Sequence, residues 1–497
     1  MVVIISGLPG TGKTTVAREL GKELGAPVLT TDEIRKRLSD KDKYASKTKH
    51  KVYDRLFQLA EEVLSEKASV IMDGTFFKKK LRSQACQLAH RKDRCAFILE
   101  IRCDQSLVKK RLEIRNEENK DASEADFRVF KIIQSQFEPI REEHFVLDTG
   151  NEQGWKEKLL DIANTMRVQE KQKKVIDQLK EEAGMRLIQT HISWVLLNGT
   201  FAHKVKKPVR FSFVDYSTLE KRRHFCVKEN EINSRLCPDL YLGVAAIHKN
   251  GRITLDDEDG EAVEFAVRMK ELPQKERMDH RLEENTVRES HIENIADILA
   301  DFHAETGSAP DELGSPEVIK ENFAPAFDAE SIMKQYFDAT EKVASIQARV
   351  NNFLHTELDL FERRISAQKI RDCHGDVRTK NIFIHEDRIF LFDAIEFNER
   401  ISGCDVAAEI AFLAMDLDFF GRIDLAQTFL DRYLSRTGER DIGTLIDFYK
   451  CYRAMVEALV QSYLLADTEV NTERKTGAAE DCRKYLDLAY GYAEALR

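Results

Sequence analysis

Residues 1–15 read MVVIISGLPGTGKTT, an apolar run that leads directly into a glycine-rich loop. The run Val2–Ser6 is short and apolar, which predicts a buried strand. Residues 7–14 match the pattern GxxxxGK[ST], and helical spacing follows from Lys13 to Leu24. In this order of strand, loop and helix, backbone N–H groups can wrap a phosphate, and the helix N-terminus adds partial positive charge. The sequence therefore predicts a phosphate-binding loop directly after the first strand.

The rest of residues 1–165 alternates short apolar segments with amphipathic ones. Further strands are predicted at Pro27–Thr30, Ser69–Met72, Cys95–Arg102 and Phe145–Leu147. Such alternation indicates an α/β domain with a doubly wound parallel sheet. Residues 166–185 are rich in charge, and we expect them to form a solvated linker helix.

The glycine-rich loop supplies most candidate nucleotide contacts. They are Gly7, Gly10, Thr11, Gly12, Lys13, Thr14 and Thr15. Lys13 is expected to reach the β- and γ-phosphates of ATP, and Thr14 to hold Mg²⁺. Asp73 ends the third predicted strand and is a candidate for a Mg²⁺ ligand acting through water, or for a substrate contact.

Two other features belong to the acceptor side of this predicted crevice. Asp32 follows the second strand at the C-terminal edge of the sheet, where it could accept the proton of a substrate hydroxyl, and Arg35 could hold an anionic substrate. The alternative for Asp32 is the N-cap of a helix over residues 33–38. Arg111 and Arg115 share one helix face, as a lid over the phosphates or as a solvated basic face.

From residue 186 the pattern changes to a β-rich lobe, 186–272, followed by a mostly helical lobe, 273–497. Asn198-Gly199 lies between two alternating runs and predicts a hairpin. A helix over Ser217–Leu236 precedes strands near Tyr241–Lys249 and Val263–Met269. A small β lobe followed by a helical lobe is typical of an α+β, protein-kinase-like domain.

A second polar cluster lies within residues 373–396, CHGDVRTKNIFIHEDRIFLFDAIE. Phosphoryl transfer needs a carboxylate near the acceptor hydroxyl and oxygen ligands for Mg²⁺. Asp376 is the candidate base, and Asn381 and Asp393 are candidate metal ligands. Glu396 could add a further carboxylate to the metal or position the substrate. We expect His374 to be a structural hydrogen-bonding residue.

The β-rich lobe should supply the remaining nucleotide contacts. Lys204 and Lys206 point to the same face of one strand. We favour Lys204 as the lysine that neutralises the α- and β-phosphates and expect Lys206 to be solvated. Glu229 is the expected partner, with Glu220 and Glu231 as alternatives. Met269 begins the segment expected beside the adenine.

Residues 1–165 resemble the small P-loop kinases that include polynucleotide 5′-kinases, gluconate kinases and zeta-toxin-type enzymes. The resemblance rests on the segments GLPGTGKTT, TTDEIR, RLEIR and ASEAD, the last at residues 122–126. In polynucleotide kinases an Asp followed three residues later by Arg supplies the base and a phosphate contact. Asp32 and Arg35 match that spacing, so the resemblance implies a kinase.

Most of residues 190–415 resemble aminoglycoside-phosphotransferase-like kinases, and more closely the subgroup fused to a P-loop kinase, described as bifunctional aminoglycoside phosphotransferase/ATP-binding proteins. The carriers are residues 191–209, 211–244, CHGDVRTKNIFI and LFDAIEFN. The domain order departs from the relatives, in which the phosphotransferase half more often comes first. Asp416 and Asp418 could catch a cationic acceptor, but in an apolar helix they also suit a helix-end role.

Composition narrows the classes of protein. The 497 residues carry a formal net charge of −10, which argues against a broad basic nucleic-acid surface. Apolar runs fall short of the roughly 18 residues of a membrane span. Nine cysteines without a CxxC pair fit a reducing cytoplasm. We therefore expect a cytoplasmic protein with no membrane partner.

The sequence thus predicts a two-site phosphotransferase that uses ATP and Mg²⁺. The C-terminal half would phosphorylate a hydroxyl of a small molecule, such as a sugar or aminocyclitol, and the N-terminal half would be a second small P-loop kinase. The alternatives for the N-terminal half are a polynucleotide 5′-hydroxyl kinase-like module, and a nucleotide-binding regulator that transfers nothing. These alternatives stay open at the level of sequence.

Overall fold

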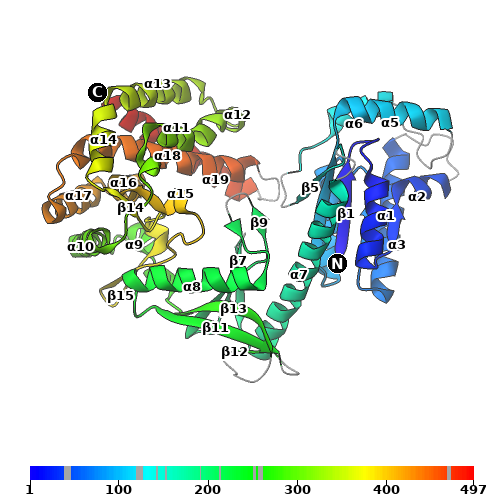
Figure 1. Cartoon of the computed structure of the whole chain (residues 1–497), viewed down its shortest axis with the longest axis horizontal. Coiled ribbons are helices and arrows are strands. Elements are labelled where there is room, and N and C mark those ends of the chain that lie inside the picture. The colour runs from blue at the N-terminus through cyan, green and yellow to red at the C-terminus, as the bar shows by residue number, and fades with distance from the viewer. Residues whose placement is uncertain are drawn as a thin grey trace. The chain divides into compact units, whose positions relative to one another are not determined.

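A computed structural model of the chain describes residues 1–37, 46–118, 127–140, 144–150, 154–190, 192–211, 214–249, 253–255, 261–466 and 472–496. The chain divides into two compact units, Met1–Asp177 and Gln178–Arg497 (Figure 1). The division falls within one long helix, and each unit is described by itself below.

The first unit is a five-stranded parallel sheet with strand order β2-β3-β1-β4-β5. Its elements are β1 (Val2–Gly7), α1 (Lys13–Leu24), β2 (Val28–Thr30), α2 (Thr31–Arg37), α3 (Ser46–Glu66), β3 (Val70–Asp73), α4 (Lys79–Arg91), β4 (Ala96–Arg102), α5 (Gln105–Glu118), α6 (Phe127–Gln136), β5 (Phe145–Asp148) and α7 (Trp155–Glu182). The five strands and α1 lie where the sequence predicts them, within about one residue.

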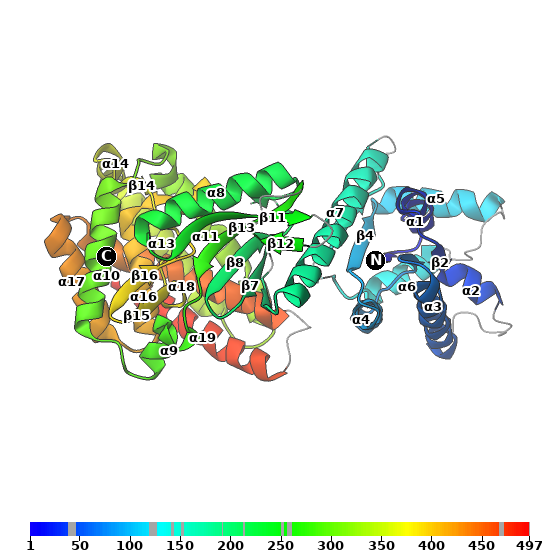
Figure 2. The same cartoon turned by 90° about the horizontal axis from the view of Figure 1, so that it is seen from below.

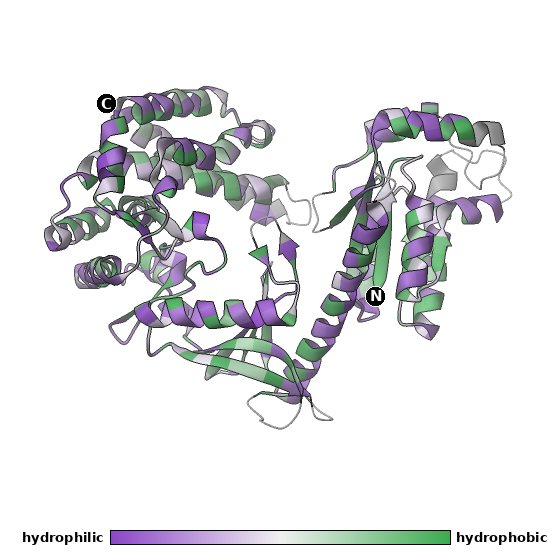
Figure 3. Ribbon diagram, viewed as in Figure 1, coloured by the Kyte–Doolittle hydropathy of each residue, from purple (hydrophilic) through white to green (hydrophobic). Residues whose placement is uncertain are grey.

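The central strand β1 explains the layering of this unit. It is apolar along its length (Figure 3). Val3 and Ile5 pack with α1 and α7 on one face of the sheet. Val2 and Ile4 pack with α3 and α4 on the other face. Because alternate side chains of a strand point to opposite faces, a wholly apolar β1 requires helices on both sides.

The predicted linker helix, residues 166–185, is helical as far as Glu182, where α7 ends. It is not solvated on all faces, because Met166 and Ile176 are buried. The amino group of Met1 also forms an ion pair with Glu170 at 2.7 Å. Residues 166–177 therefore pack within the first unit, through buried apolar side chains and an ion pair, although their composition suggests a solvated helix.

The second unit begins with a six-stranded antiparallel sheet, strand order β12-β11-β13-β8-β7-β6. The elements of this small lobe are β6 (Arg186–Gln189), β7 (Ser193–Leu197), β8 (Phe201–Lys206), β9 (Arg210–Phe211), β10 (Val214–Asp215), α8 (Leu219–Leu236), β11 (Tyr241–Lys249), β12 (Ile253–Leu255) and β13 (Glu261–Lys270). The predicted hairpin at Asn198-Gly199 joins β7 to β8. Helix α8 lies along the sheet (Figure 2), where Cys226 and Leu236 join the buried core.

The rest of the second unit is a helical lobe with two short hairpin-like pairs. Its elements are η1 (Gln274–Glu276), α9 (Met278–Glu283), α10 (Glu289–Glu305), η2 (Asp311–Gly314), α11 (Pro316–Asp328), α12 (Glu330–Met333), α13 (Thr340–Thr356), α14 (Leu358–Ser366), β14 (Ile370–Asp372), η3 (Thr379–Asn381), β15 (Ile382–His385), β16 (Arg388–Leu391), α15 (Glu399–Ser402), β17 (Gly403–Asp405), α16 (Val406–Phe419), α17 (Ile423–Thr437), α18 (Ile442–Ala466) and α19 (Thr472–Ala495). Every residue from Val406 to Leu417 is buried, so α16 is the centre of this lobe.

The two units thus form an α/β P-loop domain followed by an α+β, two-lobed domain of the protein-kinase-like kind. Among the described residues, none of the helices combines the length and apolar character that a membrane crossing requires.

Candidate active sites

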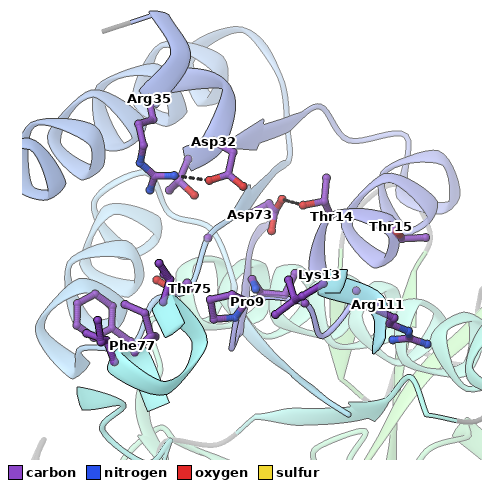
Figure 4. Close-up of a pocket in the computed structure, with 18 of the residues that line it drawn as sticks. Pro9, Lys13, Thr14, Thr15, Asp32, Arg35, Asp73, Thr75, Phe77 and Arg111 are labelled. Atoms are coloured by element: carbon purple, nitrogen blue, oxygen red, sulfur yellow. Dashed lines mark hydrogen bonds and ion pairs between the residues drawn. The ribbon is translucent and has the colours of Figure 1, made fainter. Parts of the chain in front are cut away.

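The phosphate-binding loop follows β1 and borders a pocket of about 300 Å³ (Figure 4). Gly10 has φ +79°, and a Cβ there would lie 2.9 Å from Val108 and 3.0 Å from Leu112. The Nζ of Lys13 donates to the carbonyl of Leu8 at 2.6 Å, which holds the ammonium group against the loop. The predicted loop residues that line the pocket are Gly10, Gly12, Lys13, Thr14 and Thr15.

Gly7 and Thr11, also predicted to bind the nucleotide, do not line that pocket. Thr11 is buried, and its hydroxyl donates to the carbonyl of Leu8 at 2.8 Å. A Cβ at Gly7 would lie 2.6 Å from the carbonyl oxygen of Ile101. Both residues therefore contact the protein and stabilise the conformation of the loop.

A candidate metal-binding pair joins the start of α1 to the end of β3. Thr14 Oγ1 donates to Asp73 Oδ2 at 2.7 Å (Figure 4). The other carboxylate oxygen of Asp73 is buried and has no hydrogen-bond partner among the described residues. Burial raises the pKa of Asp73 to about 6, although the Lys13 ammonium and the Thr14 hydroxyl act in the opposite direction. An unpaired buried carboxylate oxygen beside a threonine hydroxyl fits a hard cation such as Mg²⁺.

Asp32 and Arg35 lie across the same pocket and form an ion pair with each other (Figure 4). The Glu33 N–H donates to Thr30 Oγ1 at 3.3 Å, so Thr30 occupies the capping position of α2. The structure therefore gives no support to the N-cap interpretation of Asp32. Asp32 instead lines the pocket, and its role as a base stays a prediction.

The wall opposite the loop was not identified from the sequence. It includes Tyr53, Thr75, Phe77, Ile132 and Ile133. The Tyr53 hydroxyl lies 3.2 Å from Thr75 Oγ1 and accepts from the Phe76 N–H at 3.0 Å. Thr75 lies two residues after the end of β3, a position that the sequence could have indicated. Tyr53 of α3 and Ile132 and Ile133 of α6 reach the pocket only through tertiary packing.

Arg111, predicted as a lid residue, is fixed beside the loop. Its guanidinium donates to the Thr149 hydroxyl at 3.1 Å and the Thr149 carbonyl at 2.9 Å. The Thr149 hydroxyl in turn donates to the Thr11 carbonyl at 2.7 Å. The side chain of Arg115 and the stretch 122–126 lie outside the described residues.

In the second unit, the predicted Lys204–Glu229 pair is present, with Nζ and Oε1 2.9 Å apart. Lys204 also contacts Asp393 Oδ1 at 2.5 Å. Burial alone would lower the pKa of Lys204, but the Asp393 and Glu229 carboxylates outweigh it and raise that pKa well above the ordinary value. Glu220 and Glu231 are not needed as alternative partners. Side chains about 190 residues apart in sequence thus meet at the junction of the two lobes.

The expectation that Lys206 is solvated is wrong. The side chain of Lys206 is 1% exposed and contacts Glu229 Oε2 at 2.6 Å. It also pairs with Glu396, whose side chain is 3% exposed and accepts from the Tyr216 hydroxyl at 2.7 Å. Glu396, predicted as a metal ligand, therefore has its Oε1 taken up by two buried protein donors. The physical reason is tertiary packing, which surrounds the Lys206 ammonium with Glu229 of α8, Glu396 and the ring of Tyr216.

Asp393 stands in a strained, well-anchored loop. Its φ is +66°, which few residues other than glycine adopt. Its backbone N–H donates to the Tyr241 hydroxyl at 3.1 Å, and the Ala394 N–H donates to Asn233 Oδ1 at 2.9 Å. The Asp393 side chain is 46% exposed. Lys204 lowers the pKa of Asp393, although burial acts in the opposite direction.

Asp376 and Asn381 lie on one loop between β14 and β15. The Asn381 amide donates to Asp376 Oδ2 at 2.6 Å and to the Asp376 carbonyl at 2.9 Å. Its amide oxygen is therefore the atom that it can offer to a cation. Burial raises the pKa of Asp376, although the guanidinium of Arg378, 3.2 Å from Oδ1, acts in the opposite direction. Together with Asp393, these oxygen donors fit Mg²⁺.

The loop is held by buried acids that the sequence analysis missed. Glu409 of α16 accepts from the backbone N–H of His374 at 3.1 Å and of Gly375 at 2.6 Å. Glu457 of α18 contacts Arg378 at 3.0 Å, and burial raises its pKa to about 6. The His374 Nε2 lies 3.1 Å from the carbonyl of Phe392, the geometry of a structural residue. Sequence spacing carried no signal for Glu409 or Glu457, because their helices are placed by packing alone.

The two aspartates considered for a cationic acceptor already have protein partners. Asp416 accepts from the Thr379 N–H at 2.8 Å and from its hydroxyl at 2.6 Å. Asp418 accepts from Lys450 at 2.8 Å and from the Tyr492 hydroxyl at 2.5 Å. Met269 is buried near the end of β13, and its place beside an adenine stays a prediction.

Comparison with known proteins agrees with the first unit's architecture. Residues 2–140 match the family model described as an AAA domain. The chain is 32% identical over 310 residues to uncharacterized proteins of Mycobacterium tuberculosis and Mycobacterium bovis, a match that covers 61% of this chain. The chain spans only 58% of the length of these curated relatives.

Two solved structures match parts of the chain. Kti12 of Chaetomium thermophilum in complex with ADP-AlF3 is 18% identical with a TM-score of 0.28, over 33% of this chain and 96% of that chain. A choline/ethanolamine kinase family protein from Mesorhizobium loti is 10% identical with a TM-score of 0.38, over 65% of this chain and 99% of that chain.

The class of protein follows from the fold and the two sites. The chain joins an N-terminal α/β unit with a phosphate-binding loop, whose residues 2–140 match the AAA domain model, to a C-terminal α+β unit of two lobes. The predicted P-loop domain is thereby confirmed.

Proposed function

We propose that the chain is an ATP-dependent phosphotransferase with two sites, one in each unit, that transfer the γ-phosphoryl group of ATP to hydroxyl acceptors. The observation that carries this proposal is the assembly of Lys204, Glu229, Asp393, Asn381 and Asp376 at one junction of the second unit. A phosphate-binding cation, oxygen ligands and a base carboxylate are the parts that phosphoryl transfer requires.

In the second unit, Asp376 accepts the proton of the acceptor hydroxyl. The hydroxyl oxygen forms a bond to the γ-phosphorus of ATP, and the bond between that phosphorus and the departing ADP oxygen breaks. Lys204 neutralises the phosphates, while Asp393 and Asn381 hold the cation. Mg²⁺ supplies charge neutralisation for the developing negative charge on the phosphoryl oxygens. The raised pKa of Asp376 makes its carboxylate a better proton acceptor than an exposed aspartate.

In the first unit, the loop backbone and Lys13 bind the phosphates, and Thr14 with Asp73 holds the cation. Asp32 is the base and Arg35 holds it in place or contacts the acceptor. The pocket beyond the loop, with Thr75 and an apolar wall, favours a site with its own acceptor over a site that only binds nucleotide. We propose a small-molecule acceptor for both units and do not favour nucleic acid, given the net charge of −10.

The experiment follows label from [γ-³²P]ATP into a metabolite extract, with four full-length proteins: the parent, Asp376→Asn, Lys13→Ala and the double variant. We expect two labelled products, one lost in each single variant and both lost in the double variant. Loss of one product only in Asp376→Asn, with no product dependent on Lys13, would make the P-loop unit a regulator. Label that persists in the double variant would overturn the proposal.

A polynucleotide acceptor is tested in the same assay with a 5′-hydroxyl oligonucleotide in place of the extract. Lys13-dependent labelling of the oligonucleotide, with binding that weakens steeply as salt rises, would replace the small-molecule acceptor for the first unit.

A further inference from the structure

The two lysines of β8 have different surroundings although they share one face of the strand. Lys204 is 15% exposed and reaches Asp393, whose side chain is 46% exposed. Lys206 is 1% exposed and reaches Glu396, whose side chain is 3% exposed. Both ammonium groups contact Glu229, which is fully buried, one at each carboxylate oxygen.

Charge counting shows why the second lysine matters. A kinase that relies on one lysine–glutamate pair leaves the buried glutamate with one cation. When that lysine moves toward phosphate oxygens, the glutamate loses part of its compensation, and an uncompensated buried charge is strongly unfavourable. Here Glu229 has a second cation beside it, because its Oε2 contacts Lys206 at 2.6 Å.

Lys206 also connects two elements that must stay in register. Through Glu229 it contacts α8, and through Glu396 it contacts the segment that carries Asp393 three residues earlier. The Tyr216 hydroxyl donates to Glu396 at 2.7 Å, and the Lys206 ammonium lies 4.9 Å from the centre of the Tyr216 ring. The pair therefore sits in a closed, buried setting where neither partner can exchange for solvent.

We propose that Lys206 and Glu396 are positioning residues, a buried ion pair that fixes Glu229 and the Asp393 segment so that Lys204 is available to the phosphates of Mg²⁺-bound ATP. This inference rests on the proposed function of the second unit. It replaces the sequence-based roles of Lys206 as a solvated lysine and of Glu396 as a metal ligand. In this arrangement Lys204 is the exchangeable cation and Lys206 the permanent one.

The test removes both charges together, since removal of one would leave the other buried and unpaired. The double variant Lys206→Met/Glu396→Met is made in full-length protein that also carries Lys13→Ala, so that the first unit does not contribute nucleotide binding. The matched control, Arg222→Met/Glu264→Met, removes another buried pair of the same lobe, one with side chains 4% and 2% exposed. Arg222 lies on α8, as Glu229 does, so the control reproduces the loss of a buried charge pair on that helix.

The readout is the affinity for AMPPNP measured by titration calorimetry with and without Mg²⁺, at a temperature where thermal melts show each variant folded. In the Lys206/Glu396 variant, we expect the factor by which Mg²⁺ raises the affinity to be at least about tenfold smaller than in the parent, because Asp393 is no longer held in place. The control should keep the parent's gain. Equal Mg²⁺-dependent gains in the two double variants and the parent would overturn the inference and leave the pair a purely structural one.

Glu396→Gln keeps a side chain of the same shape and the Tyr216 hydrogen bond, and it serves if the double variant does not fold. We expect it to lose about threefold of the Mg²⁺-dependent gain, and an unchanged gain would count against the pair. If the Lys13→Ala parent binds no AMPPNP at all, the proposed function of the second unit fails and this inference fails with it. If that parent binds AMPPNP but the Lys206/Glu396 variant binds it equally well, only this inference fails.

Discussion

The two candidate sites are built from different kinds of atoms. In the first unit, the proposed phosphate site is made of backbone N–H groups of one continuous loop, residues 7–14, beside a pocket of about 300 Å³. In the second unit, the proposed site is made of side chains from β8, α8 and the loops around Asp376 and Asp393, and Lys204 already contacts carboxylates there. A backbone site depends on loop conformation, whereas a side-chain site depends on packing between distant segments. The same chemistry should therefore fail in different ways in the two units.

The largest difference should come from Lys204→Met. Nucleotide affinity in the second unit should fall by at least about 100-fold, because the cation for the α- and β-phosphates is lost. The first unit should bind as before. Two-site titration with AMPPNP measures both affinities in one experiment. An unchanged second site would mean that Lys206, and not Lys204, binds the phosphates.

A single methyl group at Gly10 should break the backbone site. With φ +79° and contacts of 2.9–3.1 Å to Val108 and Leu112, Gly10→Ala strains the loop, and we expect about a 30-fold loss of AMPPNP affinity in the first unit. Gly199→Ala is the matched control in the second unit. Its φ is +86°, but a Cβ there meets nothing within 4 Å. It should lower stability by about 1 kcal/mol and leave affinity within about twofold. Similar losses of affinity in both units would contradict the distinction.

Asn233→Ala tests how far the side-chain site depends on its supports. Asn233 accepts from the Ala394 N–H at 2.9 Å and donates to the Glu229 carbonyl at 2.8 Å. Loss of both bonds leaves buried polar groups unpaired, and we expect about a tenfold loss of Mg²⁺-dependent AMPPNP affinity in the second unit. AMPPNP titrations of the Lys13→Ala/Asn233→Ala protein and of its Lys13→Ala parent measure this difference. An unchanged affinity would show that Asn233 does not support the site.

The smallest expected effect is a pH dependence in the second unit. Burial raises the folded-state pKa of Glu457 to about 6, above its ordinary value of 4.5. The folded state therefore binds this proton more readily than the unfolded state, and stability gains as pH falls from 7 to 5. The gain should be about 1 kcal/mol relative to Glu457→Gln, which has no proton to bind. Thermal melts of both proteins at pH 5 and pH 7 give the difference, and a parallel pH response would contradict it.

The sequence by itself determined the first unit almost completely. A strand, a glycine-rich loop and a helix follow one another within 24 residues, so the predicted phosphate site is local, and the continuous apolar run of β1 required helices on both faces. It also predicted the candidate residues of the second site, because Asp376, Asn381 and Asp393 lie within 18 residues of one another. What it could not give was the wall of Tyr53, Phe77 and Ile132, which come from α3, the loop after β3, and α6.

Only the tertiary structure decided the roles of Lys206, Glu396, Glu409 and Glu457. Strand alternation placed Lys204 and Lys206 on one face but carried no information about how deeply each is buried. That depth depends on α8 lying over the end of β8, and on α16 and α18 reaching the loop around Asp376. A charged side chain is a solvated group or a buried anchor according to the partners that packing brings to it, and those partners lie far away in the sequence.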